Sequence, residues 1–76
     1  MFKVRFKREV HRFPHFIVPI GTTGTLVLLT NTTAAVLLDE PLRGCEDWDN
    51  KVYWEADIEA GLKEMKLDLE TAKTPA

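Results

Sequence analysis

The beginning of the chain alternates between apolar and basic residues, and this pattern constrains the fold more than any other feature. Residues 2–7 read Phe-Lys-Val-Arg-Phe-Lys. Successive side chains of a β-strand point to opposite faces of a sheet, so a period of two predicts a strand that is buried on one side only. We expect Phe2, Val4 and Phe6 to face inward. The outward face then carries a basic stripe formed by Lys3, Arg5 and Lys7.

Two apolar runs in the middle of the chain predict a β-hairpin. Residues 25–30 and 33–38 are rich in leucine and β-branched residues, and Asn31-Thr32 lies between them as the tip. Residues 21–24, Gly-Thr-Thr-Gly, predict a tight turn before the hairpin. With strict alternation, the inward side chains are Leu26, Leu28, Val36 and Leu38. The outward side chains are Val27, Leu29 and Leu37.

The segments on either side of the hairpin differ in character. Residues 8–20 are rich in aromatic residues, and Pro14 and Pro19 exclude a regular helix or a central strand, so we expect a long first loop. Residues 45–50 predict an acidic loop that holds Trp48. The fourth strand is expected over residues 51–54, with Val52 and Trp54 on one face.

The tail is compatible with two structures. Residues 64–70 alternate as a fifth strand would, with Met65, Leu67 and Leu69 on one face. A helix would instead align Ile58, Leu62, Met65 and Leu69. Leu67 falls outside that helical stripe, and Gly61 weakens a helix by about 1 kcal/mol relative to alanine. We expect a helical turn over 57–61 followed by a strand over 62–70, and the helix stays the alternative.

Size and composition predict one folded domain. The chain has 76 residues, of which 45% are hydrophobic and 29% charged. We expect the domain over 1–71 and a disordered end over 72–76. A chain of this size buries only about 60% of the surface that its unfolded form exposes, so such domains often need a partner protein for stability. The single cysteine, Cys45, excludes an internal disulfide and predicts a reducing, cytoplasmic compartment. We expect neither a signal peptide nor a membrane span.

Five short strands with a long first loop suggest a small closed β-barrel. The strand over 3–7, the Gly-Thr-Thr-Gly-Thr-Leu segment over 21–26 and the Val-Leu-Leu-Asp segment over 36–39 resemble the Src-homology-3-like (SH3-like) barrels, and the turn is similar to that of KOW-type domains. The resemblance implies a mostly β, five-stranded barrel. It also implies a peptide-binding, nucleic-acid-binding or ribosome-contacting module, or a small subunit of a larger enzyme. The first loop lacks the acidic residues of the peptide-binding subgroup, and the chain lacks its tyrosine pair.

The chain has more large apolar side chains than a small barrel can enclose, and this excess indicates a protein-interaction module. A barrel of this size encloses about a dozen side chains, so other large apolar residues stay at the surface, where they mark interfaces. The expected groove combines the first loop with later aromatic residues: Phe13, His15, Phe16, Trp48 and Tyr53. The hairpin face, Val27, Leu29 and Leu37, is a candidate dimer or subunit contact. In the opposing interpretation the first loop folds over this hairpin face and buries it.

A nucleic-acid-binding barrel is the alternative function. The basic residues concerned are Lys3, Arg5, Lys7, Arg8 and Arg12, with Phe13 and Phe16 near them for base stacking. The net charge of −2 argues against this alternative. First and last strands run side by side in small barrels, so the expected last strand neutralises the stripe through the outward side chains Glu64, Lys66, Asp68 and Glu70.

Catalytic and metal sites are not expected. Cys45 has no CxxC partner, and the acidic neighbours Glu46 and Asp47 should raise its pKa. His11 and His15 are spaced as helical metal ligands, but Pro14 between them disfavours a helix. The acidic run Glu46, Asp47 and Asp49 lacks the spacing of a calcium loop, and Asp49-Asn50 is better explained as a turn before the next strand. We therefore expect no enzymatic activity and no cofactor.

Overall fold

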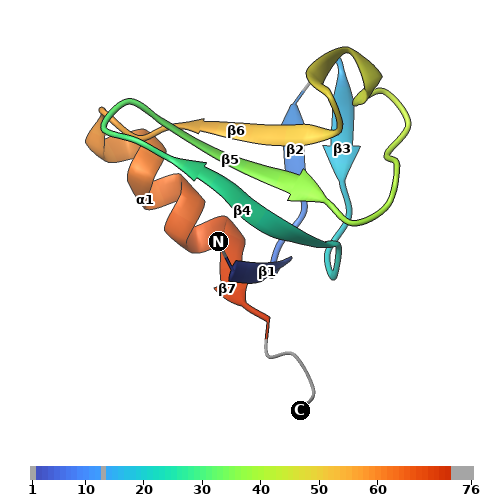
Figure 1. Cartoon of the computed structure of the whole chain (residues 1–76), viewed down its shortest axis with the longest axis horizontal. Coiled ribbons are helices and arrows are strands. Elements are labelled where there is room, and N and C mark those ends of the chain that lie inside the picture. Colours follow the sequence, from blue (N-terminus) through green and yellow to red (C-terminus); the bar gives the residue numbers. More distant parts are fainter. Residues whose placement is uncertain (1, 13, 73–76) are drawn as a thin grey trace.

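A computed structural model describes residues 2–12 and 14–72. Seven strands, one 3-10 helix and one α-helix follow one another along the described chain (Figure 1). In chain order they are β1 (Phe2–Phe6), β2 (Val10–Arg12), β3 (Phe16–Val18), β4 (Thr23–Leu29), β5 (Thr33–Leu38), η1 (Glu46–Trp48), β6 (Lys51–Glu55), α1 (Glu59–Asp68) and β7 (Leu69–Thr71). The mostly β composition expected from the sequence is confirmed.

Five strands form one antiparallel sheet in the order β6-β5-β4-β1-β7, and β2 and β3 form a separate two-stranded sheet. The larger sheet is open among the described residues, because β6 and β7 are its two edges. The closed barrel predicted from the sequence is therefore not formed. The expected neighbourhood of the first and last strands is confirmed, with Arg5 of β1 opposite Glu70 of β7.

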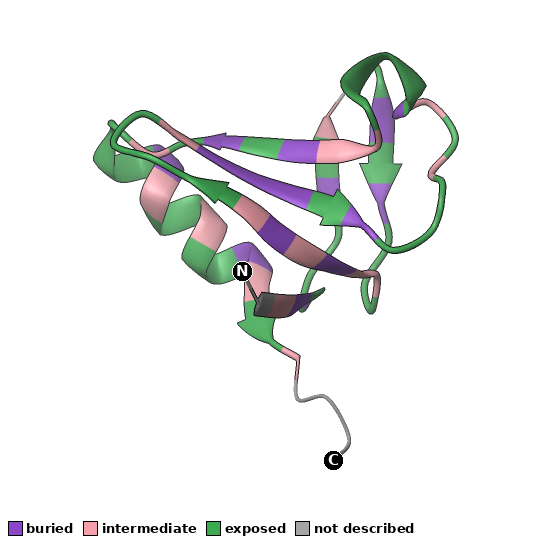
Figure 2. Cartoon of the chain, in the orientation of Figure 1, coloured by how far each residue is buried: buried purple, intermediate pink, exposed green. Residues whose placement is uncertain are grey.

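The core lies between the large sheet on one side and the β2–β3 hairpin and α1 on the other. The hairpin lies toward one end of the sheet and the helix toward the other (Figure 1). Burial alternates along β6, where Val52 and Trp54 are buried and Tyr53 between them is exposed (Figure 2). The buried apolar cluster comprises Val4, Phe6, Val10, Phe16, Val18, Leu26, Ala34, Val36, Leu38, Cys45, Val52 and Trp54.

The first loop is more ordered than the sequence predicted. It contains the β2–β3 hairpin, in which Val10 lies opposite Val18 and Arg12 opposite Phe16. Pro14 lies in the turn and Pro19 directly follows β3, so neither proline interrupts a ladder. The expectation of an irregular loop was wrong because the prolines limit the length of these strands without excluding them.

The outward and inward sets predicted for β4 were partly wrong because of a β-bulge. The ladder between β4 and β5 shifts register between Leu26 and Leu28. A bulge adds one residue to one strand and reverses the alternation beyond it. Leu28, expected inside, therefore lies on the outer face and is 40% exposed. Leu29, expected outside, lies on the inner side of the sheet at its margin, and Val27 at the bulge is half-buried.

The sheet edge at β6 is covered by side chains and by α1. The ladder to β5 uses the backbone of alternate residues, which leaves the carbonyls of Lys51, Tyr53 and Glu55 pointing away from it. Cys45 Sγ donates to Lys51 O at 3.5 Å, and Arg12 donates to Tyr53 O at 3.2 Å. Glu55 O packs against α1. Covered edges of this kind prevent strand addition.

The tail adopts the helical alternative over most of its length. Helix α1 spans Glu59–Asp68, and only the three residues of β7 follow as a strand. The strand predicted over 62–70 was wrong because the face that α1 buries is Gly61 and Asp68, with Met65 partly buried between them. The buried face of α1 therefore contains a glycine and a carboxylate, and a search for regularly spaced apolar residues does not find such a face.

The end of the described chain is paired with β1. Ala72, assigned to the disordered end by the sequence, donates its N–H to Lys3 O at 3.1 Å. The remaining residues of that expected end, 73–76, lie outside the described residues. Among the helices of the described chain, none combines the length and apolar character needed to cross a membrane.

Asp68 is the buried polar group on which the packing of α1 depends. It is 2% exposed, its Oδ2 accepts from Trp54 Nε1 at 3.0 Å and its Oδ1 pairs with Arg8 Nε. We expect Asp68→Ala to lower the free energy of unfolding by about 2 kcal/mol, because the indole N–H is then buried without an acceptor. Urea unfolding followed by tryptophan fluorescence measures this. Glu64→Ala, at an exposed position on the same helix, is the control, and an equal effect of the two substitutions would contradict the expectation.

Gly61 permits the close approach of α1 and β6. A Cβ at this position would lie 2.1 Å from Glu55 O. Helix propensity alone predicts that Gly61→Ala stabilises the protein by about 1 kcal/mol. We expect the opposite, a destabilisation of about 1–3 kcal/mol, because the helix must move away from the strand. Thermal and urea unfolding decide the sign, with Lys63→Ala as the solvent-facing control. A more stable Gly61→Ala protein would show that this contact is not formed.

Candidate functional site

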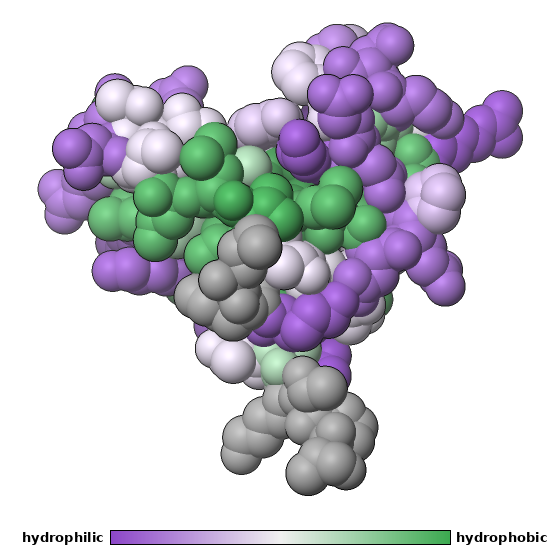
Figure 3. All heavy atoms as spheres, in the orientation of Figure 1, coloured by the Kyte–Doolittle hydropathy of each residue, from purple (hydrophilic) through white to green (hydrophobic). Residues whose placement is uncertain are grey.

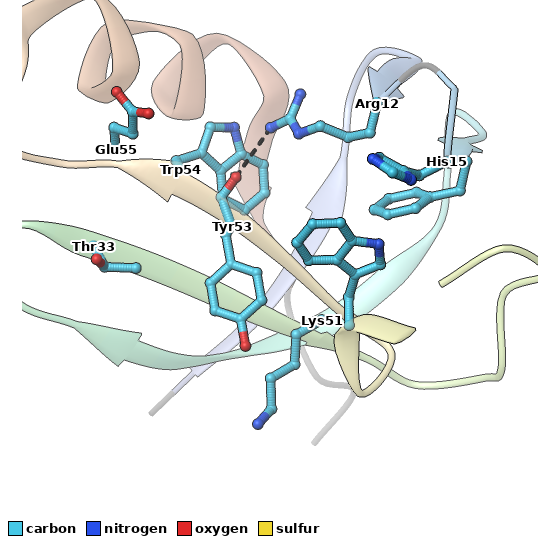
Figure 4. Close-up of a pocket in the computed structure, with 9 residues that line it drawn as sticks. Arg12, His15, Thr33, Lys51, Tyr53, Trp54 and Glu55 are labelled. Carbon is cyan, nitrogen blue, oxygen red and sulfur yellow. Dashed lines mark hydrogen bonds between the residues drawn. The ribbon is translucent and has the colours of Figure 1, made fainter. Parts of the chain in front are cut away.

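A pocket of about 370 Å³ opens between the β2–β3 hairpin, η1 and the strand β6. Pockets that hold small ligands or side chains of a partner are commonly about 300–1,000 Å³. Five of the nine lining residues have aromatic rings. The lining residues are Arg12, His15, Phe16, Thr33, Trp48, Lys51, Tyr53, Trp54 and Glu55 (Figure 4).

The hairpin supplies one wall of the pocket. His15 N–H donates to Arg12 O at 2.8 Å, which closes the turn between the strands. Arg12 and Phe16 lie opposite each other in the ladder, so their side chains point to the same face of the hairpin. Phe16 is buried in the core cluster, and this packing fixes the hairpin against the sheet.

Trp48 forms the opposite wall and owes its position to Gly44. Gly44 has a φ of +94°, and a Cβ on it would lie 2.3 Å from His15 O. Only glycine allows both this conformation and this approach, so the segment before η1 can pack against the hairpin. Trp48 thereby meets His15 edge to face, with 5.1 Å between ring centroids. Asp49 and Asn50, both with positive φ, end η1 and start β6, as the predicted turn requires.

Trp54 forms the base of the pocket and is held on several sides. Its ring stacks on Phe6 with centroids 5.9 Å apart, and its Nε1 donates to Asp68. The Arg12 guanidinium lies 5.5 Å from the ring centroid and also donates to Tyr53 O. A cation over an indole face is attracted by the ring quadrupole. This part of the pocket is therefore preorganised.

Tyr53 and Lys51 line the outer side of the pocket. They point away from Trp54, on the other face of β6 (Figure 4). The pocket thus curves around the β6 edge, with a buried indole on the inside and a 38% exposed phenol on the outside. Arg12 and Lys51 give it positive charge, and Glu55 gives one negative charge. Such a surface can bind an extended segment through ring contacts and a few polar groups.

The catalytic candidates do not assemble into a site among the described residues. Cys45 is buried, and burial first and the Glu46 charge second raise the pKa of its thiol. The expected direction is confirmed, but burial is the larger cause. His11 pairs with Glu9, whereas His15 contacts Trp48. Over residues 2–12 and 14–72, no three His, Cys, Asp or Glu side chains lie together as metal ligands.

Several residues of the predicted groove do come together. His15, Phe16, Trp48 and Tyr53 line the same pocket, and Phe13 lies outside the described residues. Sequence reasoning missed the part played by four residues and assigned a fifth, Arg12, to nucleic-acid binding. Trp54 was expected to belong to the core and not to a pocket. The contacts of Arg12 with Tyr53 and Trp54 could not be predicted, because these residues are about 40 positions away in the sequence. The four missed residues are Thr33, Lys51, Trp54 and Glu55.

The predicted hairpin face is divided between two sides of the sheet. Leu37 is 38% exposed on the outer face, together with Leu28 and Tyr53. Leu29 is 60% exposed but lines a different, apolar groove beside α1 and β7. The first loop does not fold over the outer face, because its β2–β3 hairpin packs into the core.

The basic residues proposed for nucleic acid mostly have partners within the chain. Lys3 pairs with Asp39, Arg5 Nη1 lies 3.5 Å from Glu70 Oε1, and Arg8 pairs with Asp68. The predicted neutralisation is confirmed for Glu70. It was wrong in detail elsewhere: Asp68 is buried instead of lining a strand, and Glu64 and Lys66 lie on α1. Arg12 contacts the pocket, and Lys7 is exposed and makes no ion pair with any described residue.

Comparisons with protein-family models, with curated proteins and with solved structures found no match.

The Lys3–Asp39 pair predicts a pH dependence of stability. A hydrogen bond from Lys3, then one from Thr23, and then the charge of Lys3 lower the pKa of Asp39 below its ordinary 3.8. A carboxylate with a lowered pKa in the folded state stabilises above its unfolded-state pKa, and this contribution is lost as the pH falls through the folded-state pKa. We therefore expect the free energy of unfolding to fall less between about pH 5 and about pH 3 in Asp39→Asn than in the unmodified protein.

Urea unfolding at the two pH values measures this difference. Glu40→Gln is the matched control, because Glu40 is the adjacent exposed carboxylate and makes no ion pair with a described residue. An Asp39→Asn protein with the full pH dependence of the unmodified chain would show that the pair does not form in solution.

Proposed function

We propose that this protein is a non-catalytic protein-interaction module that binds an extended segment of a partner protein in the pocket between the β2–β3 hairpin, η1 and β6. The observation that carries the proposal is the convergence of Trp48, Tyr53, Trp54, His15 and Phe16 on one cavity. Tryptophan and tyrosine are enriched among the few residues that dominate the binding energy of protein interfaces, because their rings bury large areas.

The pocket has a fixed base and exposed aromatic walls, and this arrangement favours binding over a purely structural role. Trp54 is held by Phe6 and Asp68, whereas Trp48 and Tyr53 are 37% and 38% exposed. A rigid base with exposed rims binds a ligand at a small cost in conformational entropy. Arg12 beside Trp54, and Lys51 and Glu55 near the two ends of β6, provide polar contacts for backbone groups of the bound segment.

The proposal does not require the SH3-like barrel that the sequence suggested. The described strands form an open five-stranded antiparallel sheet with a separate two-stranded hairpin, and the pocket lies where the two meet. Folds of this kind host several functions, so the proposal depends on the pocket and not on the fold. A cytoplasmic location, inferred from the single cysteine, belongs to the same proposal.

A displayed library of random peptides, selected on the immobilised protein, tests the proposal. We expect the selected peptides to lose affinity by about 30-fold with Trp48→Ala, which is the effect of removing an interface residue worth about 2 kcal/mol. Leu67→Ala, at an exposed position on α1, is the control and should bind as the unmodified protein does. Tryptophan fluorescence titration measures the affinities.

Two outcomes would overturn the proposal. One is that no peptide is enriched, and the other is that the enriched peptides bind Trp48→Ala with unchanged affinity. Retention on heparin at low salt that falls steeply as salt is added, in the absence of peptide binding, would favour the nucleic-acid alternative instead. Lys7→Ala, at an exposed basic position with no described ion-pair partner, should then weaken retention.

A further inference from the structure

The outer face of β4, β5 and β6 extends from the groove, with which it shares residues of β6, across the sheet to β4. Residues directly opposite in an antiparallel ladder point to the same side. Leu28, Ala35 and Tyr53 are opposite one another in one row across the three strands. Leu37 and Lys51 belong to the next row. These five residues, with Glu55, are called the outer face below.

This face is apolar at its centre and is not covered by another described element. Leu28, Leu37 and Tyr53 are 40%, 38% and 38% exposed. Ala35, which lies between Leu28 and Tyr53 in the ladder, is only 1% exposed. Apolar surface extends across this side of the molecule, over β4 and β5 (Figure 3). Contiguous apolar surface on a small domain marks an interface.

The charges beside this centre are self-complementary. Lys51 and Glu55 lie on the same strand, two residues before and two residues after Tyr53, and both side chains belong to the outer face. Neither makes an ion pair with any described residue. The neighbouring cations on β1 differ, because Lys3 and Arg5 already have acidic partners within the chain.

We propose that a second copy of this chain packs on the outer face and forms a twofold-symmetric dimer. A twofold axis relates a patch to itself, so a patch with a cation at one end and an anion at the other satisfies its own charges. With the axis near Tyr53, Lys51 of each copy lies next to Glu55 of the second copy. Leu28 and Tyr53 then meet the same residues across the axis, and Leu37 meets Thr33, which lies opposite Glu55 in the ladder, as in two sheets packed face to face.

The size of the patch sets the affinity of this dimer. Three strands spaced about 4.8 Å apart present a narrow face, so the contact falls at the small end of specific interfaces, below about 1,200 Å². The dimer is therefore weak and depends on concentration. A dimer formed by strand addition at the β6 edge is excluded, because Arg12, Cys45 and α1 cover the backbone of that edge.

Sedimentation velocity from about 1 µM to about 1 mM protein, the range of weak complexes, tests the proposal. We expect the sedimentation coefficient to rise with concentration toward that of a dimer. Leu37→Lys, which places a charge in the apolar centre, should hold the protein monomeric over this range. Leu67→Lys makes the same change at an exposed position on α1 and should dimerise as the unmodified protein does.

Charge exchange distinguishes the twofold arrangement from a nonspecific apolar contact. Lys51→Glu or Glu55→Lys alone should raise the dimer dissociation constant by about tenfold, because each replaces two attractive pairs with two repulsive ones. The double variant Lys51→Glu with Glu55→Lys restores opposite charges across the axis and should recover the original constant. A double variant that dissociates more readily than either single variant would overturn the arrangement.

The dimer face and the peptide groove share residues of β6, but each also has residues of its own, and these test the two proposals separately. Trp48→Ala should leave the dimer unchanged, and Leu37→Lys should leave peptide binding unchanged, so the two ideas can fail separately. A protein that stays monomeric at every concentration, with Leu37→Lys indistinguishable from it, overturns the dimer whatever the outcome of peptide selection.

Discussion

The side chain of Trp54 connects the parts of this small domain that are far apart in sequence. Phe6 of β1 stacks on its ring, Asp68 at the end of α1 accepts from its indole N–H, and the Arg12 guanidinium of the hairpin lies over the ring. An indole that is 4% exposed needs an acceptor for its polar group, and the buried carboxylate provides it. The strand, the helix and the hairpin are thus placed relative to one another by one residue, and the base of the pocket follows from the same contacts.

The close approaches in this domain are made at glycine and involve backbone atoms. Gly61 lets α1 lie against the Glu55 carbonyl, and Gly44 lets the segment before η1 lie against the His15 carbonyl. The Gly61 contact places α1 over the backbone of the β6 edge, and the Gly44 contact places the segment before η1 over the turn of the β2–β3 hairpin. The core of a chain this short is small. Contacts made at glycine let these two elements shield backbone carbonyls from water without large apolar side chains between them.

The groove and the outer face share Lys51, Tyr53 and Glu55, because the pocket curves around the edge of β6. If both proposals hold, occupation of one surface affects the other, since a ring buried against a second copy is less free to contact a peptide. Coupling of two binding events through shared residues needs no conformational change, only competition for the same side chains. The small size of the domain makes such sharing hard to avoid.

The sequence by itself determined the strands with a clear apolar pattern, because alternation and β-branched residues act locally, but it did not reveal β2 and β3. Residues 2–6 and 33–38 and the strand that begins at Lys51 follow the expected pattern. His15, Trp48 and Tyr53 line the pocket as expected from the sequence, and Phe16, expected with them, lines it from the core. Only the tertiary structure decided the path of the tail, the bulge near Val27 and the use of Arg12. Each of these depends on a partner distant in sequence: Asp68 is buried because Trp54 and Arg8 satisfy it, and no local period records that compensation.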